Sequence, residues 1–116
     1  MSYVQSVELT GADAMEKAAA MMSALRSNTP ETIGGIPVTI IRDYRSGKAL
    51  DVNTKCESVI MLPKSNVLEF VLGEQGSVIV RPSGTEPKVK YYYTAIASTE
   101  SVAKNQMDRM IAQMAK

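Results

Sequence analysis

Apolar residues at helical spacing mark both ends of this 116-residue chain, and the residues between them favour strands. In residues 12–26, and again in residues 100–114, apolar side chains recur every three or four positions, which is the spacing of one helix face. Each predicted helix therefore carries an apolar stripe that must be buried against another layer. The stripe residues are Met15, Ala18, Ala19, Met22 and Leu25 in the first helix and Ala103, Met107, Met110, Ile111 and Met114 in the second. Thr10 and Asp13 are placed to cap the first helix, and Ser98 or Thr99 the second.

Short runs rich in β-branched and aromatic residues fill the interval between the helices. We expect strands over residues 4–9, 36–44, 67–72, 77–81 and 89–97. The sequence Gly-Glu-Gln-Gly at 73–76 is typical of a hairpin connection, whereas residues 45–64 show no clear pattern. The order strand, helix, four strands, helix predicts an α+β fold in which two helices cover one face of an antiparallel sheet. Residues 1–116 are expected to form a single domain.

The charge balance and the rare residue types exclude several classes of function. The chain carries 13 Lys and Arg against 12 Asp and Glu, so its net charge is +1 and a broad basic surface for nucleic acid is not expected. Histidine is absent and Cys56 is the only cysteine, which excludes an intrachain disulfide, a zinc site built on several thiolates and a Cys–His nucleophilic pair. We find no membrane-spanning run and no signal peptide, and expect a cytoplasmic protein.

The segment with the most distinctive chemistry is the polar loop at residues 81–90, between two strongly β-prone runs. Pro82 and Pro87 fix φ at both ends of the loop, so that it loses less entropy when it holds one shape. Gly84 gives the backbone access to left-handed angles and to close approach by a ligand. Ser83, Gly84 and Thr85 each offer a backbone N–H, and converging N–H groups of this kind form an anion-binding nest.

The charges of this loop also point to an anion. Arg81, Lys88 and Lys90 contribute three positive charges and Glu86 one negative charge, so the segment has a net charge of +2 in a chain whose total is +1. A small dianion such as a phosphate monoester fits this concentration of charge better than a polymer does. The same residue types are also typical of any tight surface loop, with lysines that keep an exposed strand soluble. Residue chemistry alone leaves both interpretations open.

Residues 81–88, Arg-Pro-Ser-Gly-Thr-Glu-Pro-Lys, resemble the phosphate-binding signature of the α-D-phosphohexomutase superfamily, the phosphoglucomutase/phosphomannomutase enzymes. Residues 62–68, Leu-Pro-Lys-Ser-Asn-Val-Leu, resemble bacterial phosphoglucomutases of the group that includes phosphopentomutases, and the clear resemblance covers residues 62–97. It implies that the chain is the fourth and last domain of such an enzyme, with a TATA-binding-protein-like fold. The catalytic serine and the Mg²⁺ loop of the full-length isomerase would then lie in other domains, leaving this chain without catalytic or metal-binding residues and inactive alone.

The resemblance assigns roles to individual loop residues. Arg81, Ser83, Gly84 and Thr85 match the positions that hold the phosphate that is not being transferred, and Lys90 matches a position where relatives place another cation. The residues implied to shape the loop are Pro82, Glu86, Pro87 and Lys88. Because Glu86 would repel a dianion if it pointed inward, we expect its side chain to face outward or to pair with Lys88.

The implied reaction is an intramolecular phosphotransfer, for example from glucose 1-phosphate to glucose 6-phosphate through a bisphosphosugar. The implied partners are the phosphosugar and the other three domains, with neither nucleic acid nor membrane, and the sugar preference belongs mainly to another domain. The alternative is a stand-alone protein-interaction or anion-binding module without catalytic activity, which would use the exposed sheet and its tyrosines at 91–93. Alternation along the strand predicts that Tyr92 faces away from Tyr91 and Tyr93, whose rings are expected to pack.

Overall fold

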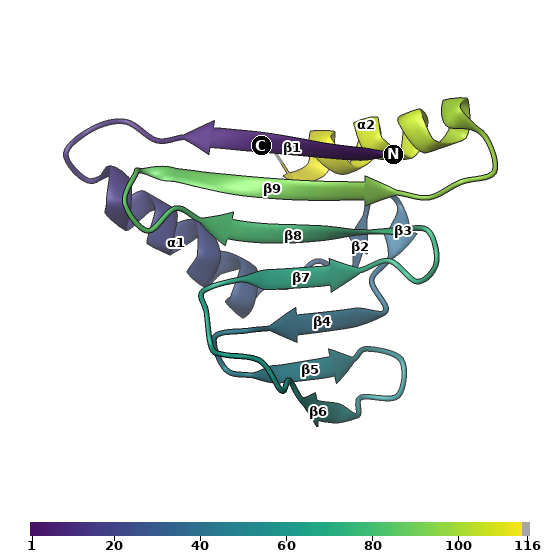
Figure 1. Cartoon of the computed structure of the whole chain (residues 1–116), viewed down its shortest axis with the longest axis horizontal. Helices are drawn as coiled ribbons and strands as arrows, with labels where there is room; N and C mark the ends of the chain where they lie inside the picture. Colours follow the sequence, from purple (N-terminus) through teal and green to yellow (C-terminus); the bar gives the residue numbers. More distant parts are fainter. Residues whose placement is uncertain (115–116) are drawn as a thin grey trace.

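The computed structural model describes residues 1–114. Seven strands form one sheet in the order β1-β9-β8-β7-β4-β5-β6, and β2 pairs with β3 in a separate small hairpin (Figure 1). The strands are β1 (Ser2–Glu8), β2 (Thr32–Ile33), β3 (Ile36–Pro37), β4 (Ile40–Asp43), β5 (Lys48–Asp51), β6 (Glu57–Val59), β7 (Leu68–Val71), β8 (Gly76–Pro82) and β9 (Lys88–Ala95). The helices are α1 (Ala14–Ser27) and α2 (Glu100–Met114). All of the strand pairs are antiparallel, and the predicted α+β class is confirmed.

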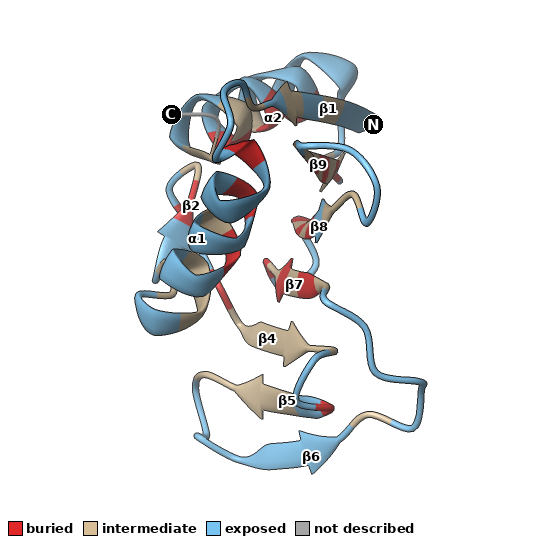
Figure 2. Ribbon diagram, turned by 90° about the vertical axis from the view of Figure 1, so that its left-hand side faces the viewer, coloured by how far each residue is buried: buried red, intermediate tan, exposed pale blue. Residues whose placement is uncertain are grey.

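Both helices lie on one side of the sheet, as predicted, and no helix of residues 1–114 covers the other side, which we call the open face (Figure 2). The core fills the space between the helices and the sheet. Its largest fully buried side chains are Tyr93, Phe70, Met22, Ile33, Leu68, Leu72 and Met110. Burial alternates strictly along β9, so that Tyr91 and Tyr93 are buried while Tyr92 lies on the open face, which confirms the predicted alternation. The hydrophobic surroundings raise the pKa of both buried tyrosines.

Both predicted helices are present, and α1 departs from the prediction in its first residue, its stripe and its cap. Helix α2 has the predicted bounds, and the N–H of Val102 donates to Oγ1 of Thr99 at 3.3 Å, so Thr99 caps it. Helix α1 begins at Ala14, two residues later than expected, and its buried stripe is Ala14, Ala18 and Met22. Ala18 and Met22 of the predicted stripe are buried as expected, whereas Met15 is 49% exposed and Ala19 is also exposed, because the buried residues follow a spacing of four from Ala14. Asp13 makes no side-chain cap; its carboxylate instead lies 3.4 Å from Lys17 Nζ.

The strand predictions were correct for β1, β7, β8 and β9 and incomplete between α1 and β7. The expected long strand at residues 36–44 is divided, because Pro37 lacks an N–H and ends β3, and the chain then crosses to β4 in the main sheet. Residues 45–64 contain the hairpin of β5 and β6, which the sequence did not reveal since β6 is exposed throughout and has no buried face. The turn at 73–76 connects β7 to β8 as predicted.

No helix among residues 1–114 has the length and apolar character needed to cross a membrane.

Candidate functional site

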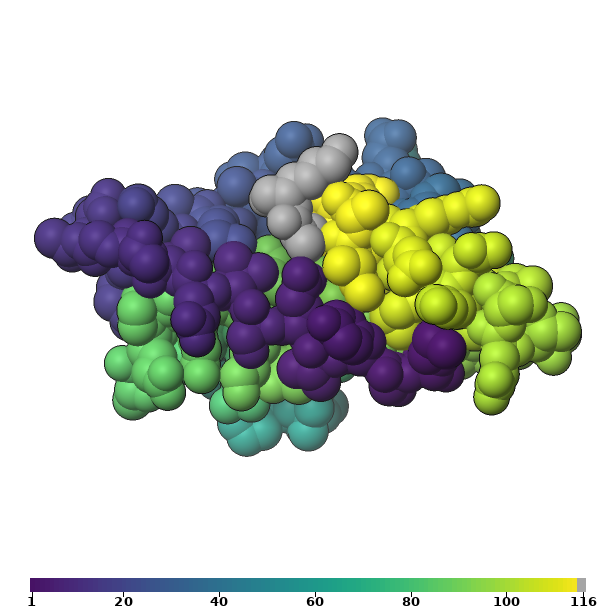
Figure 3. Space-filling model, turned by 90° about the horizontal axis from the view of Figure 1, so that it is seen from above, coloured from purple at the N-terminus to yellow at the C-terminus, as the bar shows by residue number. Residues whose placement is uncertain are grey.

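The loop at residues 83–87 connects β8 to β9 and is anchored to the sheet at both of its ends. Beyond the last strand pair, Pro82 with Val89, the N–H of Ser83 donates to the carbonyl of Lys88 at 2.8 Å. The carbonyl of Pro87 accepts from the N–H of Leu9 at 2.8 Å, which ties the loop to the chain leaving β1. Seen from above, the green surface of the loop lies at one end of the molecule, on the side away from the yellow helix α2 (Figure 3). The sheet therefore holds the loop at its rim and presents it outward.

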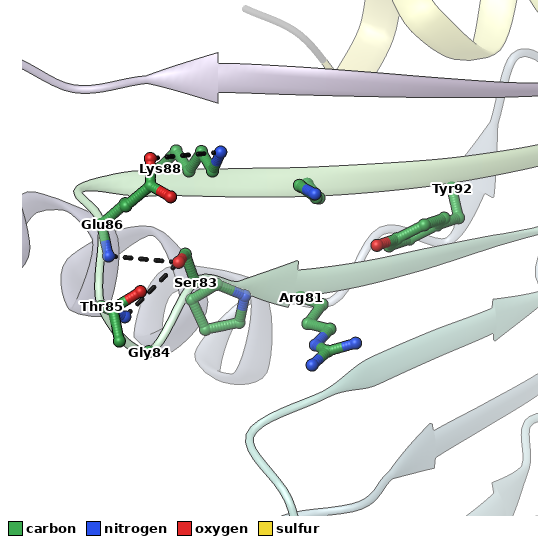
Figure 4. Close-up of a pocket in the computed structure, with 9 residues that line it drawn as sticks. Arg81, Ser83, Gly84, Thr85, Glu86, Lys88 and Tyr92 are labelled. Atoms are coloured by element: carbon green, nitrogen blue, oxygen red, sulfur yellow. Dashed lines mark hydrogen bonds and ion pairs between the residues drawn. The ribbon is translucent and has the colours of Figure 1, made fainter.

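The side chain of Ser83 organises the interior of the loop. Its Oγ accepts hydrogen bonds from the N–H of Glu86 at 3.1 Å and from the N–H of Thr85 at 3.4 Å (Figure 4). This corrects the predicted nest of three free amides, because the Ser83 N–H is committed to Lys88 and the Thr85 N–H already has a long bond. The N–H of Gly84 has no partner among residues 1–114.

The backbone of Gly84 does not adopt the left-handed angle that the sequence suggested. Its φ is not positive, so the loop does not require glycine for a left-handed angle. A Cβ built at this position would have no atom of residues 1–114 within 4 Å, its two neighbours in the chain aside. The glycine therefore leaves open space beside an unbonded N–H, and this arrangement still allows a ligand to approach the backbone closely.

Charge is distributed unevenly around the loop. Lys88 Nζ lies 3.3 Å from Glu86 Oε2, as anticipated for a glutamate that would otherwise repel an anion. Arg81 and Lys90 face each other across β8 and β9, and neither forms an ion pair within residues 1–114. Arg81 is exposed, and in Figure 4 its guanidinium extends over the sheet toward β7, to the side of the loop. Two uncompensated cations thus stand at the base of the loop.

A hollow of about 300 Å³ brings the predicted site residues together. It is lined by Arg81, Pro82, Ser83, Gly84, Thr85, Glu86, Lys88, Lys90 and Tyr92 (Figure 4). Pro87 is the one predicted loop residue that does not line it. Tyr92 was not among the predicted site residues, although the alternation along β9 places its side chain on the same face as Lys90. A second hollow, of about 390 Å³, lies on the other side of residues 81–84, against α1 and residues 65–67.

The described part of the chain contains no group of three or more His, Cys, Asp or Glu side chains that could hold a metal ion. The chemistry that the hollow offers is the binding of an anion through a guanidinium, an ammonium, hydroxyls and one backbone N–H.

Comparison of the sequence with known proteins shows the family of the chain. The family described as "Phosphoglucomutase/phosphomannomutase, C-terminal domain" matches residues 8–113. The chain belongs to this family. It is similar to the phosphoglucomutase of Staphylococcus aureus strain bovine RF122 / ET3-1, with 42% identity over 84 residues, and to that of Staphylococcus haemolyticus strain JCSC1435, with 38% identity over 82 residues. These matches cover 72% and 71% of the chain but 15% of each relative, so this phosphoglucomutase/phosphomannomutase C-terminal domain corresponds to a small part of those proteins.

Proposed function

We propose that this chain is the phosphate-binding domain of a phosphosugar mutase and that the loop at residues 83–87 holds the phosphate that is not being transferred. The observation that carries the proposal is the pair of unmatched cations, Arg81 and Lys90, at the base of a hollow into which the loop opens. The family membership supports it, because the named relatives are phosphoglucomutases.

Each part of the hollow suits one feature of a phosphate monoester. The guanidinium of Arg81 has the planar fork that matches two phosphate oxygens, and Lys90 supplies a second positive charge. The free N–H of Gly84 and the hydroxyl of Thr85 are donors for the remaining oxygens. Because Glu86 is paired with Lys88, its negative charge is offset close to where the dianion would bind. The hydrogen bonds of Ser83 hold the loop in shape before the ligand arrives.

The proposed reaction moves a phosphoryl group between two hydroxyls of one sugar through a bisphosphosugar. A loop that recognises the phosphate and not the sugar hydroxyls accepts either end of the molecule, which such a reaction requires. The rest of the parent enzyme would supply the phosphorylated serine and the Mg²⁺ site, as the resemblance to the mutases implies. Closure of this domain over the substrate would exclude water and position the reacting atoms.

Binding to the isolated chain tests the site. NMR titration with glucose 1-phosphate should give a dissociation constant near 1 mM, because a single domain supplies only part of the contacts. Arg81→Ala should weaken binding by about 10-fold to 150-fold, since it removes a charge-assisted pair of hydrogen bonds worth roughly 1.5–3 kcal/mol. Lys104→Ala, which removes an exposed charge from α2, is the matched control and should change affinity less than twofold. Equal affinities for wild type and Arg81→Ala would contradict the proposed site.

A chimera tests the role in catalysis. The matching C-terminal segment of the S. aureus phosphoglucomutase is replaced by this chain, and conversion of glucose 1-phosphate to glucose 6-phosphate is measured. We expect activity in the chimera, a fall of at least tenfold on Arg81→Ala within it, and none from this chain alone. A folded chimera whose activity is insensitive to Arg81→Ala would argue against the proposal.

A further inference from the structure

The hollow beside the loop is larger than a phosphoryl group alone requires. Its volume of about 300 Å³ lies at the lower end of the range for pockets that hold whole small molecules. The loop, Arg81, Lys90 and Tyr92 all line this hollow, and we assign the phosphate to the loop and its two cations. A ligand that fills the hollow must therefore have a body that reaches from the phosphate to this ring.

The cations and Tyr92 lie in successive rows across the open face. Arg81 pairs with Lys90 between β8 and β9, and the next pair on the same face is Ile79 with Tyr92. On the other side of β9, Val4 of β1 is the partner of Tyr92. Adjacent rows on one face are two residues apart, which is about 7 Å along a strand. A row of three apolar side chains thus lies beside the cationic row.

Tyr92 differs from its two neighbours in lying outside the buried core of the chain. Tyr91 and Tyr93 are 2% and 1% exposed, and their rings stack with centroids 6.1 Å apart. Tyr92 is only partly buried, and its side chain makes neither a hydrogen bond nor a ring contact within residues 1–114. In Figure 4 its hydroxyl is directed toward the end of the sheet that bears the loop, so that the ring extends along the sheet toward the proposed phosphate position.

We propose that Tyr92, flanked by Val4 and Ile79, is the platform on which the sugar ring of the phosphosugar lies while the loop holds its phosphate. This inference rests on the proposed phosphate site. The C–H groups on a pyranose face pack against an aromatic ring, as apolar groups do in other small-molecule sites, while the tyrosine hydroxyl remains at the wet edge. Because this platform contacts the face of the sugar ring and not particular hydroxyls, glucose 1-phosphate and glucose 6-phosphate should bind with similar affinity.

The test compares two ligands on the 116-residue chain, inorganic phosphate and glucose 1-phosphate, by NMR titration. Tyr92→Ala should weaken binding of glucose 1-phosphate about fivefold and of inorganic phosphate less than twofold, because only the sugar loses its contact. Tyr92→Phe, which keeps the ring, should retain both affinities. Tyr3→Ala is the matched control: it removes a tyrosine that is 49% exposed and stacks on Tyr93 at the helix side of the sheet, and it should alter neither affinity.

The outcomes separate this inference from the proposal on which it rests. If Tyr92→Ala weakens both ligands equally, or neither, the platform is refuted and the phosphate site stands. If the wild-type chain binds neither ligand, the phosphate site is refuted and the platform with it. Thermal melts establish that each variant is folded, and Tyr92→Leu, which is bulky but has no flat ring, replaces Tyr92→Ala if the latter fails to fold and should show the same selective loss.

Discussion

The turns at the two ends of β8 differ in how closely the rest of the chain approaches their glycines. At the β7–β8 end, Gly76 has a φ of +151°, and a Cβ there would collide with the carbonyl oxygen of Thr94 on β9. At the β8–β9 end, Gly84 has an ordinary φ, and a Cβ would meet nothing within 4 Å. Packing within the chain thus explains the first glycine and not the second. The difference indicates that the β7–β8 turn serves the fold, whereas the β8–β9 loop leaves room for something outside the chain.

The hydrogen bonds of the two turns show the same contrast. The β7–β8 turn is held by bonds within it and to other segments: the N–H of Gln75 donates to the carbonyl of Leu72 at 3.1 Å, the N–H of Ile96 donates to the carbonyl of Gln75 at 2.9 Å, and the N–H of Gly73 donates to Oγ1 of Thr39 at 3.0 Å. In the β8–β9 loop a side chain, that of Ser83, supplies the internal acceptor, and the N–H of Gly84 is left without a partner. Thr39 and Ile96 thus tie the first turn to the rest of the fold, whereas the second turn is completed by a ligand in our account.

The largest expected effect is on the β7–β8 turn. Gly76→Ala should lower the free energy of unfolding by about 3 kcal/mol or more, because it combines an unfavourable φ with a clash against the backbone of β9. Gly73→Ala is the matched control within the same turn: its φ of +61° is also unfavourable, but its Cβ would be 3.7 Å from a methyl of Thr39, and the loss should be about 1 kcal/mol. Urea denaturation measures both. Equal losses would show that the close approach to β9 is not decisive.

A smaller effect is expected where Ser83 organises the β8–β9 loop. Ser83→Ala should lower the free energy of unfolding by about 0.5–1 kcal/mol. The exposed N–H groups of Thr85 and Glu86 lose their acceptor, but they can donate to water instead. It should also weaken phosphate binding severalfold, because the loop is then less ordered before binding. Ser83→Thr keeps the acceptor and should restore most of the affinity. Denaturation and phosphate titration on the same samples check both statements, and unchanged affinity in Ser83→Ala would show that the bonds of Ser83 do not prepare the loop.

The smallest expected change in stability is at Gly84. Gly84→Ala should leave the free energy of unfolding within about 0.5 kcal/mol of the wild type, because the position is open and its φ is ordinary. Affinity for phosphate should nevertheless fall, since the added methyl occupies space beside the free N–H. A marked loss of stability would mean that Gly84 serves the fold as Gly76 does, and the contrast between the two turns would be lost.

Much of this fold was predictable because its helices and central strands carry local patterns. The apolar spacing of α2 gave its bounds, and the alternation of Leu68, Phe70 and Leu72 identified the buried face around β7. Two members of the predicted α1 stripe, Met15 and Ala19, are exposed, since Ala14 and Met15 are both apolar and only the sheet beneath decides which of them is buried. The β5–β6 hairpin has no apolar alternation to detect. The contact of Arg26 Nε with Asp43 at 3.2 Å joins α1 to β4 and leaves no local signal in the sequence.

The candidate site was predictable in composition and not in geometry. The residues of the loop are contiguous, so their charges and hydroxyls could be counted directly from the sequence. The hydrogen bonds that commit the N–H of Ser83 and the ordinary φ of Gly84 depend on how β8 meets β9. The place of Tyr92 in the hollow follows from strand register, which brings it beside Ile79 and one row from Arg81.

The measurement that tests the central claim most directly is a map of backbone amide chemical shifts as inorganic phosphate is added to the labelled chain. The account predicts that the largest and saturable shifts occur at Gly84 and Thr85, and that they disappear in Arg81→Ala while the rest of the spectrum is unchanged. Largest shifts at another part of the molecule, such as the first turn of α2, or shifts at Gly84 that persist without Arg81, would contradict it.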